Sequence, residues 1–284
     1  MNRKICFSVV IGVLTFLSFV PGKASAQHQC MGDGCNIGLH PWSGKKVAYI
    51  GDSITDPNNG DGQIVHYWQW LQQRLGIVPL VYAVSGYEWY HAPELTDKLY
   101  AEHGKDVDAI IVFLGTNDFN SAVPLGEWFT EEKTVVNRAR YPEKMAKVER
   151  THRTLVMDDS TVRGRINIAL KKLKSLYPDK QIVLLTPIHR SFAHFGEYNE
   201  QPDENYQNEI GLYVDSYVDV VKEAANVWAV TVLDLNSLCG LNPMVSEQVD
   251  YFFNTDTDRL HPNSKGHERI ALTLEAQLRS LPIY

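Results

Sequence analysis

Cysteine is scarce in this chain, with four residues in 284. Cys6 lies in the N-terminal apolar run. Of the other three, Cys30 and Cys35 are the nearest pair, and the odd number leaves one thiol over. No CxxC pair and no cysteine–histidine cluster is present. A fold built on disulfides and a structural zinc site are therefore not expected.

Long apolar runs are confined to the N-terminus. Arg3 and Lys4 precede an apolar stretch at residues 5–20, and Ala24-Ser25-Ala26 follows it. This order predicts a signal peptide at residues 1–26, cleaved after Ala26. An uncleaved anchor is the weaker alternative, because the small residues fit a cleavage site. The protein is thus expected to be exported, to the periplasm or the extracellular space, without stable membrane insertion after cleavage.

An excess of basic residues is also lacking. The full chain has a formal net charge of −7, and residues 27–284 hold 24 basic and 34 acidic residues, a net charge of −10. Such a surface argues against nucleic acid or an anionic membrane as the main partner. The remaining 258 residues suit one large α/β domain.

Short apolar runs alternate with longer amphipathic stretches after residue 45. The runs are predicted strands, at 46–50, 80–84, 108–114, 181–186 and 230–233. The stretches are predicted helices, at 64–75, 165–176, 211–225 and 266–278. Strands that are apolar on both faces, separated by helices, are typical of a parallel sheet of about five strands covered on both sides. We therefore expect an α/β domain at 46–284, preceded by an N-terminal extension at 27–45.

Residues 119–161 do not fit this alternation. They have few apolar clusters and many charges, and no strand is predicted among them. A segment of this length is either functional or mobile. A cap that selects a large polar substrate and a solvated helical insertion are the two alternatives.

Polar residues follow the predicted strands where ligands bind in open α/β sheets. Ser53 follows the first strand, and Asp258 and His261 precede the last helix. A serine hydroxyl needs a base to become a nucleophile, and His261, oriented by Asp258, can act as that base. The backbone N–H groups of Ser53 and Gly86 and the side-chain amide of Asn117 are candidate donors to an oxyanion.

The same blocks carry a family resemblance. Gly51-Asp52-Ser53-Ile54-Thr55-Asp56, then Ser85-Gly86, then Gly115-Thr116-Asn117-Asp118, and finally Asp258-x-x-His261-Pro262 resemble the signature blocks of the SGNH (GDSL) hydrolase superfamily. The resemblance implies a flavodoxin-like three-layer sandwich, no cofactor, and Ser53, Asp258 and His261 as catalytic residues. The second block departs from the usual Asn-x-Gly-x-x-Gly, since the run reads Tyr-Ala-Val-Ser-Gly.

Residues near these motifs are assigned either a structural or a substrate-binding role. Asp52, Asp56 and Asp118 are expected to be structural. Tyr87 and Trp89 directly follow Gly86, and His189 and Arg190 follow the fourth strand, so these four are candidate substrate-binding residues. No histidine pair has the HExxH pattern, so no metal site is expected.

The expected function is that of a serine carboxylic-ester hydrolase. The predicted substrate is a short O-acyl ester, of a small molecule or a glycan. An acyltransferase with the same triad and a non-catalytic glycan-binding module are the alternatives. The sequence does not define an oligomeric state.

Overall fold

The computed structural model of the protein describes residues 40–138 and 147–284. The predicted signal peptide, Cys30 and Cys35 lie outside these ranges, as does most of the predicted N-terminal extension. Within the described ranges, no helix is both long and apolar enough to cross a lipid bilayer.

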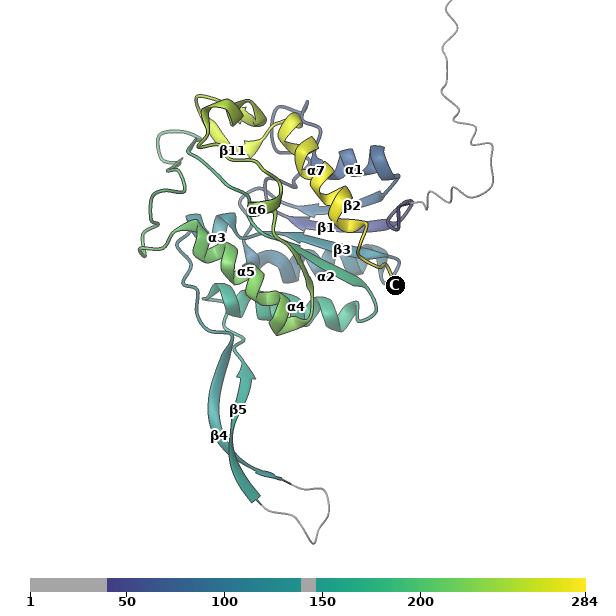
Figure 1. The fold of residues 1–284 in the computed structure, drawn as a ribbon, viewed down its shortest axis with the longest axis vertical. Helices are drawn as coiled ribbons and strands as arrows, with labels where there is room; N and C mark the ends of the chain where they lie inside the picture. Colours follow the sequence, from purple (N-terminus) through teal and green to yellow (C-terminus); the bar gives the residue numbers. More distant parts are fainter. Residues whose placement is uncertain (1–39, 139–146) are drawn as a thin grey trace, which may run out of the picture. The chain divides into compact units, whose positions relative to one another are not determined.

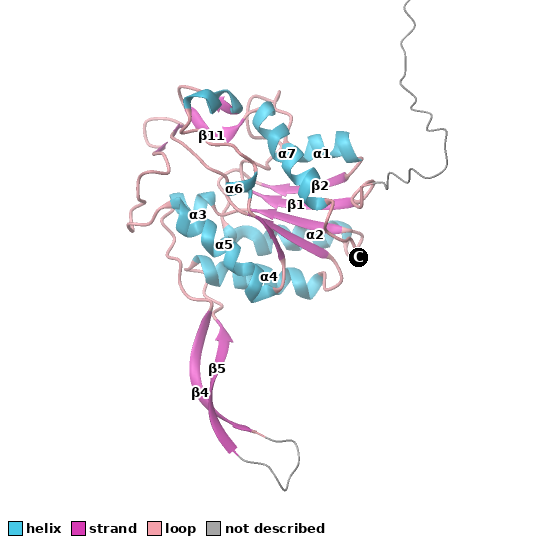
Figure 2. Cartoon of the chain, in the orientation of Figure 1, coloured by secondary structure: helices cyan, strands magenta, loops and turns pink. Residues whose placement is uncertain are grey.

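Five mutually parallel strands form the central sheet, as predicted (Figures 1 and 2). They are β1 (Lys46–Gly51), β2 (Val78–Ala83), β3 (Ala109–Phe113), β6 (Gln181–Leu185) and β9 (Thr231–Leu233). Their order is β2-β1-β3-β6-β9. Counted along the chain, this is the 2-1-3-4-5 order of flavodoxin-like sheets, in which the carboxyl ends of the strands form the ligand-binding edge.

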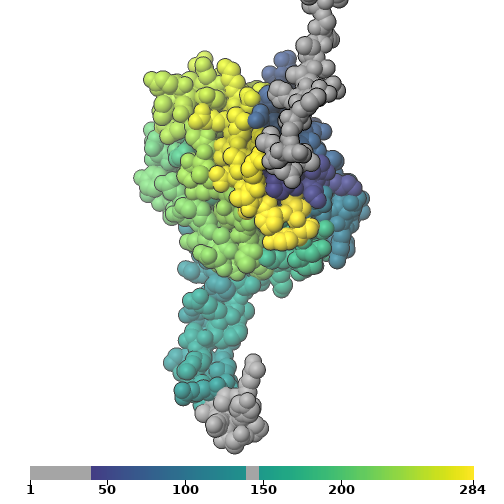
Figure 3. All heavy atoms as spheres, turned by 45° about the vertical axis from the view of Figure 1, so that its right-hand side comes forward, coloured from purple at the N-terminus to yellow at the C-terminus, as the bar shows by residue number. Residues whose placement is uncertain are grey.

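Helices cover both faces of the sheet and enclose two apolar cores. Helices α1 (Tyr67–Leu75) and α7 (Ser264–Leu278) pack on one face, with Val47 and Tyr49 of β1. The opposite face carries α2 (Ala92–His103), α4 (Val162–Leu176) and α5 (Val214–Trp228), which pack on Ala48 and Ile50 of β1. Figure 3 shows the C-terminal residues, in yellow, beside the purple and blue N-terminal part of the domain. Successive residues of β1 enter opposite cores because side chains alternate between the two faces of a strand.

Local signals fix several helix ends. The Thr161 side chain accepts a hydrogen bond from the N–H of Gly164 at the start of α4, and Asn263 accepts two at the start of α7. Both residues are typical N-caps. Helix α1 ends at Gly76, which adopts a left-handed conformation with φ of 69°. Helix α2 is not among the predicted helices.

A second, smaller sheet and several short helices complete the domain. The sheet is antiparallel, with strand order β10-β11-β7-β8. Its strands are β7 (Ala193–His194), β8 (Glu200–Gln201), β10 (Phe252–Asn254) and β11 (Asp258–Pro262). The short helices are α3 (Thr116–Asn120), α6 (Leu235–Leu238), η1 (Trp89–His91) and η3 (Ser246–Tyr251).

The segment at residues 119–161 contains a β-hairpin, so the expectation of no strand there is wrong. Among the described residues, strands β4 (Phe129–Asn137) and β5 (Lys147–Leu155) pair only with each other (Figure 2). Most of their residues are exposed. Glu131 pairs with Arg153 across the strands at 2.9 Å. Because neither face is buried, the strands lack the alternation of apolar and polar residues that identifies a strand in a sequence.

The base of the hairpin is tied to helix α4. The side-chain amide of Asn167 donates to the carbonyl oxygens of Trp128 and Val156, at 3.1 and 2.8 Å. These two residues flank the paired strands, and Val156 N–H also donates to the Trp128 carbonyl at 3.0 Å. Asn167 is fully buried, so the hairpin leaves the domain from a fixed point.

Candidate active site

The turn after β1 presents Ser53. The N–H groups of Thr55 and Asp56 both donate to the carbonyl of Asp52 at 2.9 Å, and the Ile54 N–H donates to the Asp52 carboxylate at 3.1 Å. The turn is so tight that a Cβ on Gly51 would lie 2.4 Å from the Thr55 hydroxyl oxygen. Glycine is therefore required before the Asp-Ser pair, and the turn holds Ser53 at the carboxyl edge of the sheet.

Ser53, His261 and Asp258 form one hydrogen-bonded chain. The Ser53 hydroxyl lies 2.8 Å from His261 Nε2, and His261 Nδ1 lies 2.8 Å from Asp258 Oδ2. The other carboxylate oxygen of Asp258 accepts the N–H groups of Leu260 and His261, each at 3.1 Å. All three side chains are buried, with exposed fractions of 6 to 8 %. This order of contacts is that of a nucleophile, a general base and the carboxylate that orients the base.

Two further loops bring the predicted oxyanion donors to the same place. Gly86 follows β2, and Asn117 lies in α3 after β3; both line the hollow beside Ser53. One N–H of the Asn117 amide donates to the Tyr87 carbonyl at 2.9 Å, which fixes the amide nitrogen and leaves its second N–H for another acceptor. Gly115, just before α3, has φ of 123°, a conformation that favours glycine.

Asp56 joins the nucleophile loop to the Gly86 loop. One of its carboxylate oxygens accepts both the N–H and the hydroxyl of Ser85, each at 2.9 Å. The other oxygen accepts the N–H of Asn58 at 2.9 Å. The structural role expected for Asp56 is therefore specific, because its carboxylate connects two of the loops that build the site.

The carboxyl groups of Asp52 and Asp118 are buried just beneath the site. Burial raises the pKa of Asp52 to about 7, with Asp118 adding to the rise and the Ile54 N–H opposing it. Burial likewise raises the pKa of Asp118 to about 6, against the lowering effect of the Trp89 N–H and Arg165. Asp118 accepts the Trp89 N–H at 3.0 Å and Arg165 Nη1 at 2.9 Å. Both residues thus brace loops of the site, in line with the structural role expected for them.

A hollow of about 320 Å³ opens beside the triad. Its lining includes residues that the sequence did not single out, which are three amides, an aromatic ring and a leucine: Asn59, Asn199, Gln201, Phe195 and Leu260. Phe195 is 45 % exposed, and its ring centroid lies 5.6 Å from that of His261. Gln201 lies in β8, Leu260 lies in β11 and the others lie in loops, and no motif or spacing assigned any of them to the site.

The four expected substrate-binding residues do not line this hollow. Trp89 is fully buried in the core, and Tyr87 stacks on His91 with ring centroids 4.1 Å apart. His189 is paired with Glu204 at 2.7 Å, and Arg190 is only 1 % exposed. Adjacency to Gly86 or to a strand end did not predict where these side chains point.

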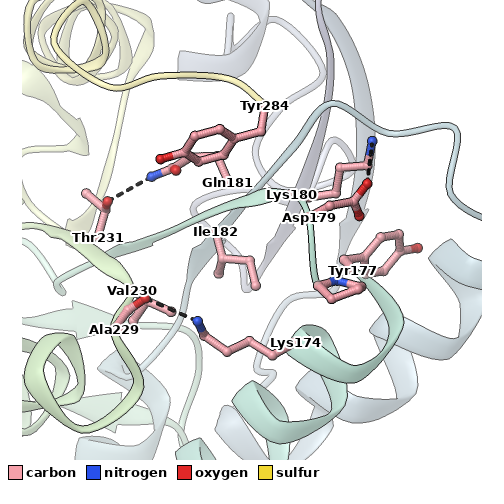
Figure 4. Close-up of a pocket in the computed structure, with 11 residues that line it drawn as sticks. Lys174, Tyr177, Asp179, Lys180, Gln181, Ile182, Ala229, Val230, Thr231 and Tyr284 are labelled. Atoms are coloured by element: carbon pink, nitrogen blue, oxygen red, sulfur yellow. Dashed lines mark hydrogen bonds and ion pairs between the residues drawn. The ribbon is translucent and has the colours of Figure 1, made fainter.

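A second hollow, of about 690 Å³, lies elsewhere (Figure 4). It is lined by Gln181 and Thr231, which begin β6 and β9, and it is therefore at the opposite edge of the sheet from Ser53. Two of its polar side chains have partners within the hollow: the Gln181 amide donates to the Thr231 hydroxyl at 2.8 Å, and Lys174 donates to the backbone carbonyl of Ala229 at 3.1 Å. None of the triad residues lies there.

Comparisons with solved structures agree with this fold. A protein from Lactobacillus plantarum shares 24% identity and a TM-score of 0.62, over 84% of this chain and 98% of its own. A protein from Chitinophaga pinensis named as a possible lipase shares 22% identity and a TM-score of 0.60, over 84% and 98%. A salicylyl-acyltransferase from a tetracycline biosynthetic pathway shares 16% identity and a TM-score of 0.54, over 84% and 56%.

The sequence comparisons identify the family. No curated protein sequence matches this chain. Residues 49–269 match the GDSL-like Lipase/Acylhydrolase family, and this range contains Ser53, Gly86, Asn117, Asp258 and His261. The match covers well over half of the chain. The matched residues include most of the central sheet and the Ser53–His261–Asp258 chain described above. The chain therefore belongs to the GDSL-like lipase/acylhydrolase family.

Proposed function

We propose that this protein is an exported serine esterase that hydrolyses short O-acyl esters of carbohydrates through a covalent acyl-enzyme. The observation that carries the proposal is the continuous hydrogen-bonded chain from Ser53 through His261 to Asp258, with both links at 2.8 Å. Such a chain gives a serine hydroxyl the base that it needs to attack an ester carbonyl.

The proposed reaction has two steps. In the first, Ser53 Oγ attacks the carbonyl carbon, His261 Nε2 takes the hydroxyl proton, and the proton then passes to the departing alkoxide. In the second, water attacks the acyl-enzyme by the same route and releases the acid. The N–H groups of Ser53 and Gly86 and the free N–H of Asn117 would stabilise the oxyanion in both steps.

The size and polarity of the hollow support the substrate class. A space of about 320 Å³ beside Ser53 must hold both the acyl group and the adjoining part of the alcohol, which favours a short acyl chain. Asn59, Asn199 and Gln201 offer hydrogen-bonding groups to a polar alcohol. The predicted signal peptide supports a substrate outside the cytoplasm.

The deciding experiment combines a substrate series with a nucleophile variant. The wild-type protein is tested on p-nitrophenyl esters of increasing acyl length and on acetylated xylo-oligosaccharides. Ser53→Ala is expected to reduce turnover by about 10⁴-fold or more, with little change in melting temperature. A serine-directed phosphonate should modify the wild-type protein at Ser53. Unchanged turnover in Ser53→Ala would overturn the assignment of the nucleophile.

The same assay separates the two alternative functions. An acyltransferase would pass the acyl group to an added alcohol or sugar and release little free acid in its presence. A glycan-binding module would bind acetylated oligosaccharides without turnover and without reaction with the phosphonate. Steady release of acetate that is unaffected by added acceptors would support the hydrolase.

A further inference from the structure

Gln201 lines the catalytic hollow and is held there by a network of hydrogen bonds. It lies in β8, which pairs with β7, and β7 pairs with β11, the strand that carries Asp258 and His261. Its side-chain oxygen accepts Arg190 Nη2 at 2.9 Å and Asn120 Nδ2 at 2.7 Å. Both donors therefore converge on one oxygen of a residue at the site.

These contacts decide the orientation of the Gln201 amide. Arg190 has only hydrogen-bond donors, so the atom that it contacts must be the amide oxygen. Asn120 is oriented by the same argument, because its own side-chain oxygen accepts Arg190 Nη1 at 2.6 Å. With the Gln201 oxygen directed to Arg190, its NH₂ group has one nearby acceptor among the described residues, Asn199 Oδ1 at 3.4 Å. The Gln201 amide can therefore donate a hydrogen bond to a ligand.

The anchor of this network is buried and close to the oxyanion loop. Arg190 is 1 % exposed, and its Nη1 also contacts the Thr116 hydroxyl at 3.2 Å. Thr116 and Asn120 are the first and last residues of α3, the helix that contains Asn117. A buried charged anchor of this kind would be costly without its partners, so the geometry of Gln201 is fixed along with that of the oxyanion helix.

Phe195 supplies the apolar counterpart on the His261 side of the hollow. Its ring lies 5.6 Å from the His261 ring, and it is 45 % exposed. In the proposed mechanism, His261 returns its proton to the departing alkoxide, so groups next to His261 adjoin the alcohol of the ester. An aromatic face beside amide donors suits a sugar ring, which has apolar C–H faces and hydroxyl groups at its edge.

We propose that Gln201 is a specificity-determining residue that donates a hydrogen bond to an oxygen of the sugar alcohol, while Phe195 packs against the ring. The inference rests on the proposed esterase function and adds the residues that select its alcohol. It predicts discrimination between hydroxylated and bare rings, because a donor placed to bind a hydroxyl group remains unpaired with an alcohol that lacks one.

The test compares two kinds of acetate ester with rings of similar size. One kind is the set of monoacetates of methyl β-xylopyranoside, and the other is cyclohexyl acetate, which has no hydroxyl group. The wild-type protein should prefer the sugar acetates by roughly tenfold or more in kcat/KM. Gln201→Glu keeps the oxygen that Arg190 and Asn120 need but removes the N–H donors. It should lose most of this preference, chiefly through a higher KM for the sugar acetates.

The matched control is Glu200→Gln, which exchanges the same two groups at the exposed neighbouring position of β8. It should keep the wild-type preference. Gln201→Met provides a second variant if the carboxylate impairs folding, and it should lose the preference as well.

The outcomes separate this inference from the proposed function. A wild-type protein that hydrolyses p-nitrophenyl acetate but shows no preference for the sugar acetates would overturn the inference and leave the esterase function standing. A preference that survives in both Gln201 variants would also overturn it. Failure to hydrolyse any ester, together with no phosphonate labelling, would overturn the proposed function and the inference with it.

Discussion

Individual polar side chains hold the loops of this site together through hydrogen bonds. Asp56 connects the nucleophile loop to the Gly86 loop, and Arg190 connects the oxyanion helix to Gln201. Each of these residues joins segments that are far apart in the chain. Loops that share a buried hydrogen-bonded partner cannot shift independently, and catalytic geometry depends on such fixed positions.

Asn117 offers a direct test at the same scale. Asn117→Ala is expected to lower kcat by roughly a hundredfold with little change in KM, because an oxyanion donor acts mainly on the charge that develops in the transition state. Steady-state kinetics with p-nitrophenyl acetate measures both constants. A higher KM with an unchanged kcat would mean that Asn117 binds the ground state of the substrate instead.

Two buried histidines lie where α1 and α7 meet. The His66 and His267 rings are 4.9 Å apart, and Nδ1 of each has no hydrogen-bond partner among the described residues. Burial, with smaller contributions from His66 and His261, holds the pKa of His267 well below its usual 6.5. Burial also lowers the pKa of His66. This contact between elements is therefore expected to weaken in acid.

The sign of the effect follows from proton uptake. Below about pH 6.5 the unfolded chain binds a proton at His267 that the folded chain does not bind, so the free energy of unfolding decreases as the pH falls, by up to about 1.4 kcal/mol per pH unit. His267→Gln should show a smaller loss between pH 7 and pH 5 in urea unfolding. Other groups, such as Asp52, contribute equally to the wild-type protein and the variant. An equal decrease in the free energy of unfolding in the two proteins would therefore contradict this explanation.

The hairpin of β4 and β5 is a separable element. Within the part of the chain that the structure describes, its strands pair only with each other, and they do not line the catalytic hollow. Replacing residues 131–153 by a short turn, with Trp128, Val156 and their contacts to Asn167 kept, should leave kcat/KM for p-nitrophenyl acetate within about twofold. The cap hypothesis predicts a sharp fall in kcat/KM for a large acetylated polysaccharide. If the folded variant keeps the wild-type ratio of kcat/KM for the polysaccharide to kcat/KM for p-nitrophenyl acetate, the hairpin has no role in substrate selection.

Elements differ in how well the sequence predicts them, for physical reasons. Strands β1, β3 and β6 are buried on both faces and the edge strands β2 and β9 are half-buried, so their apolar runs identify them. The hairpin strands are exposed on both faces and leave no such signal. The triad could be placed because motif and strand end coincide, whereas Gln201 could not. Its position depends on the β7–β8 pairing and on Arg190, which only the folded chain brings together.

At the scale of the whole molecule, one buried thiol can report on global unfolding. Cys239 is a free cysteine with 2 % exposure, and burial raises the pKa of its thiol. In a variant with Cys30 and Cys35 replaced by serine and Cys6 removed with the signal peptide, this thiol should react with a disulfide reagent only as the domain unfolds. The labelling rate in increasing urea should follow the unfolding rate measured by circular dichroism. Fast labelling of the native protein would reveal local opening near Cys239.

The two halves of the triad lie 208 residues apart in the chain. Ser53 follows the first strand of the domain, and Asp258 and His261 are in its last strand. A polypeptide still being synthesised therefore has a serine without its base. If the protein is exported as an unfolded chain, as the predicted signal peptide implies, it crosses the membrane without esterase activity. Catalysis would then begin only after export, when strand β11 folds into place and brings His261 to Ser53. Esters in the cytoplasm of the producing cell would not be exposed to the active enzyme.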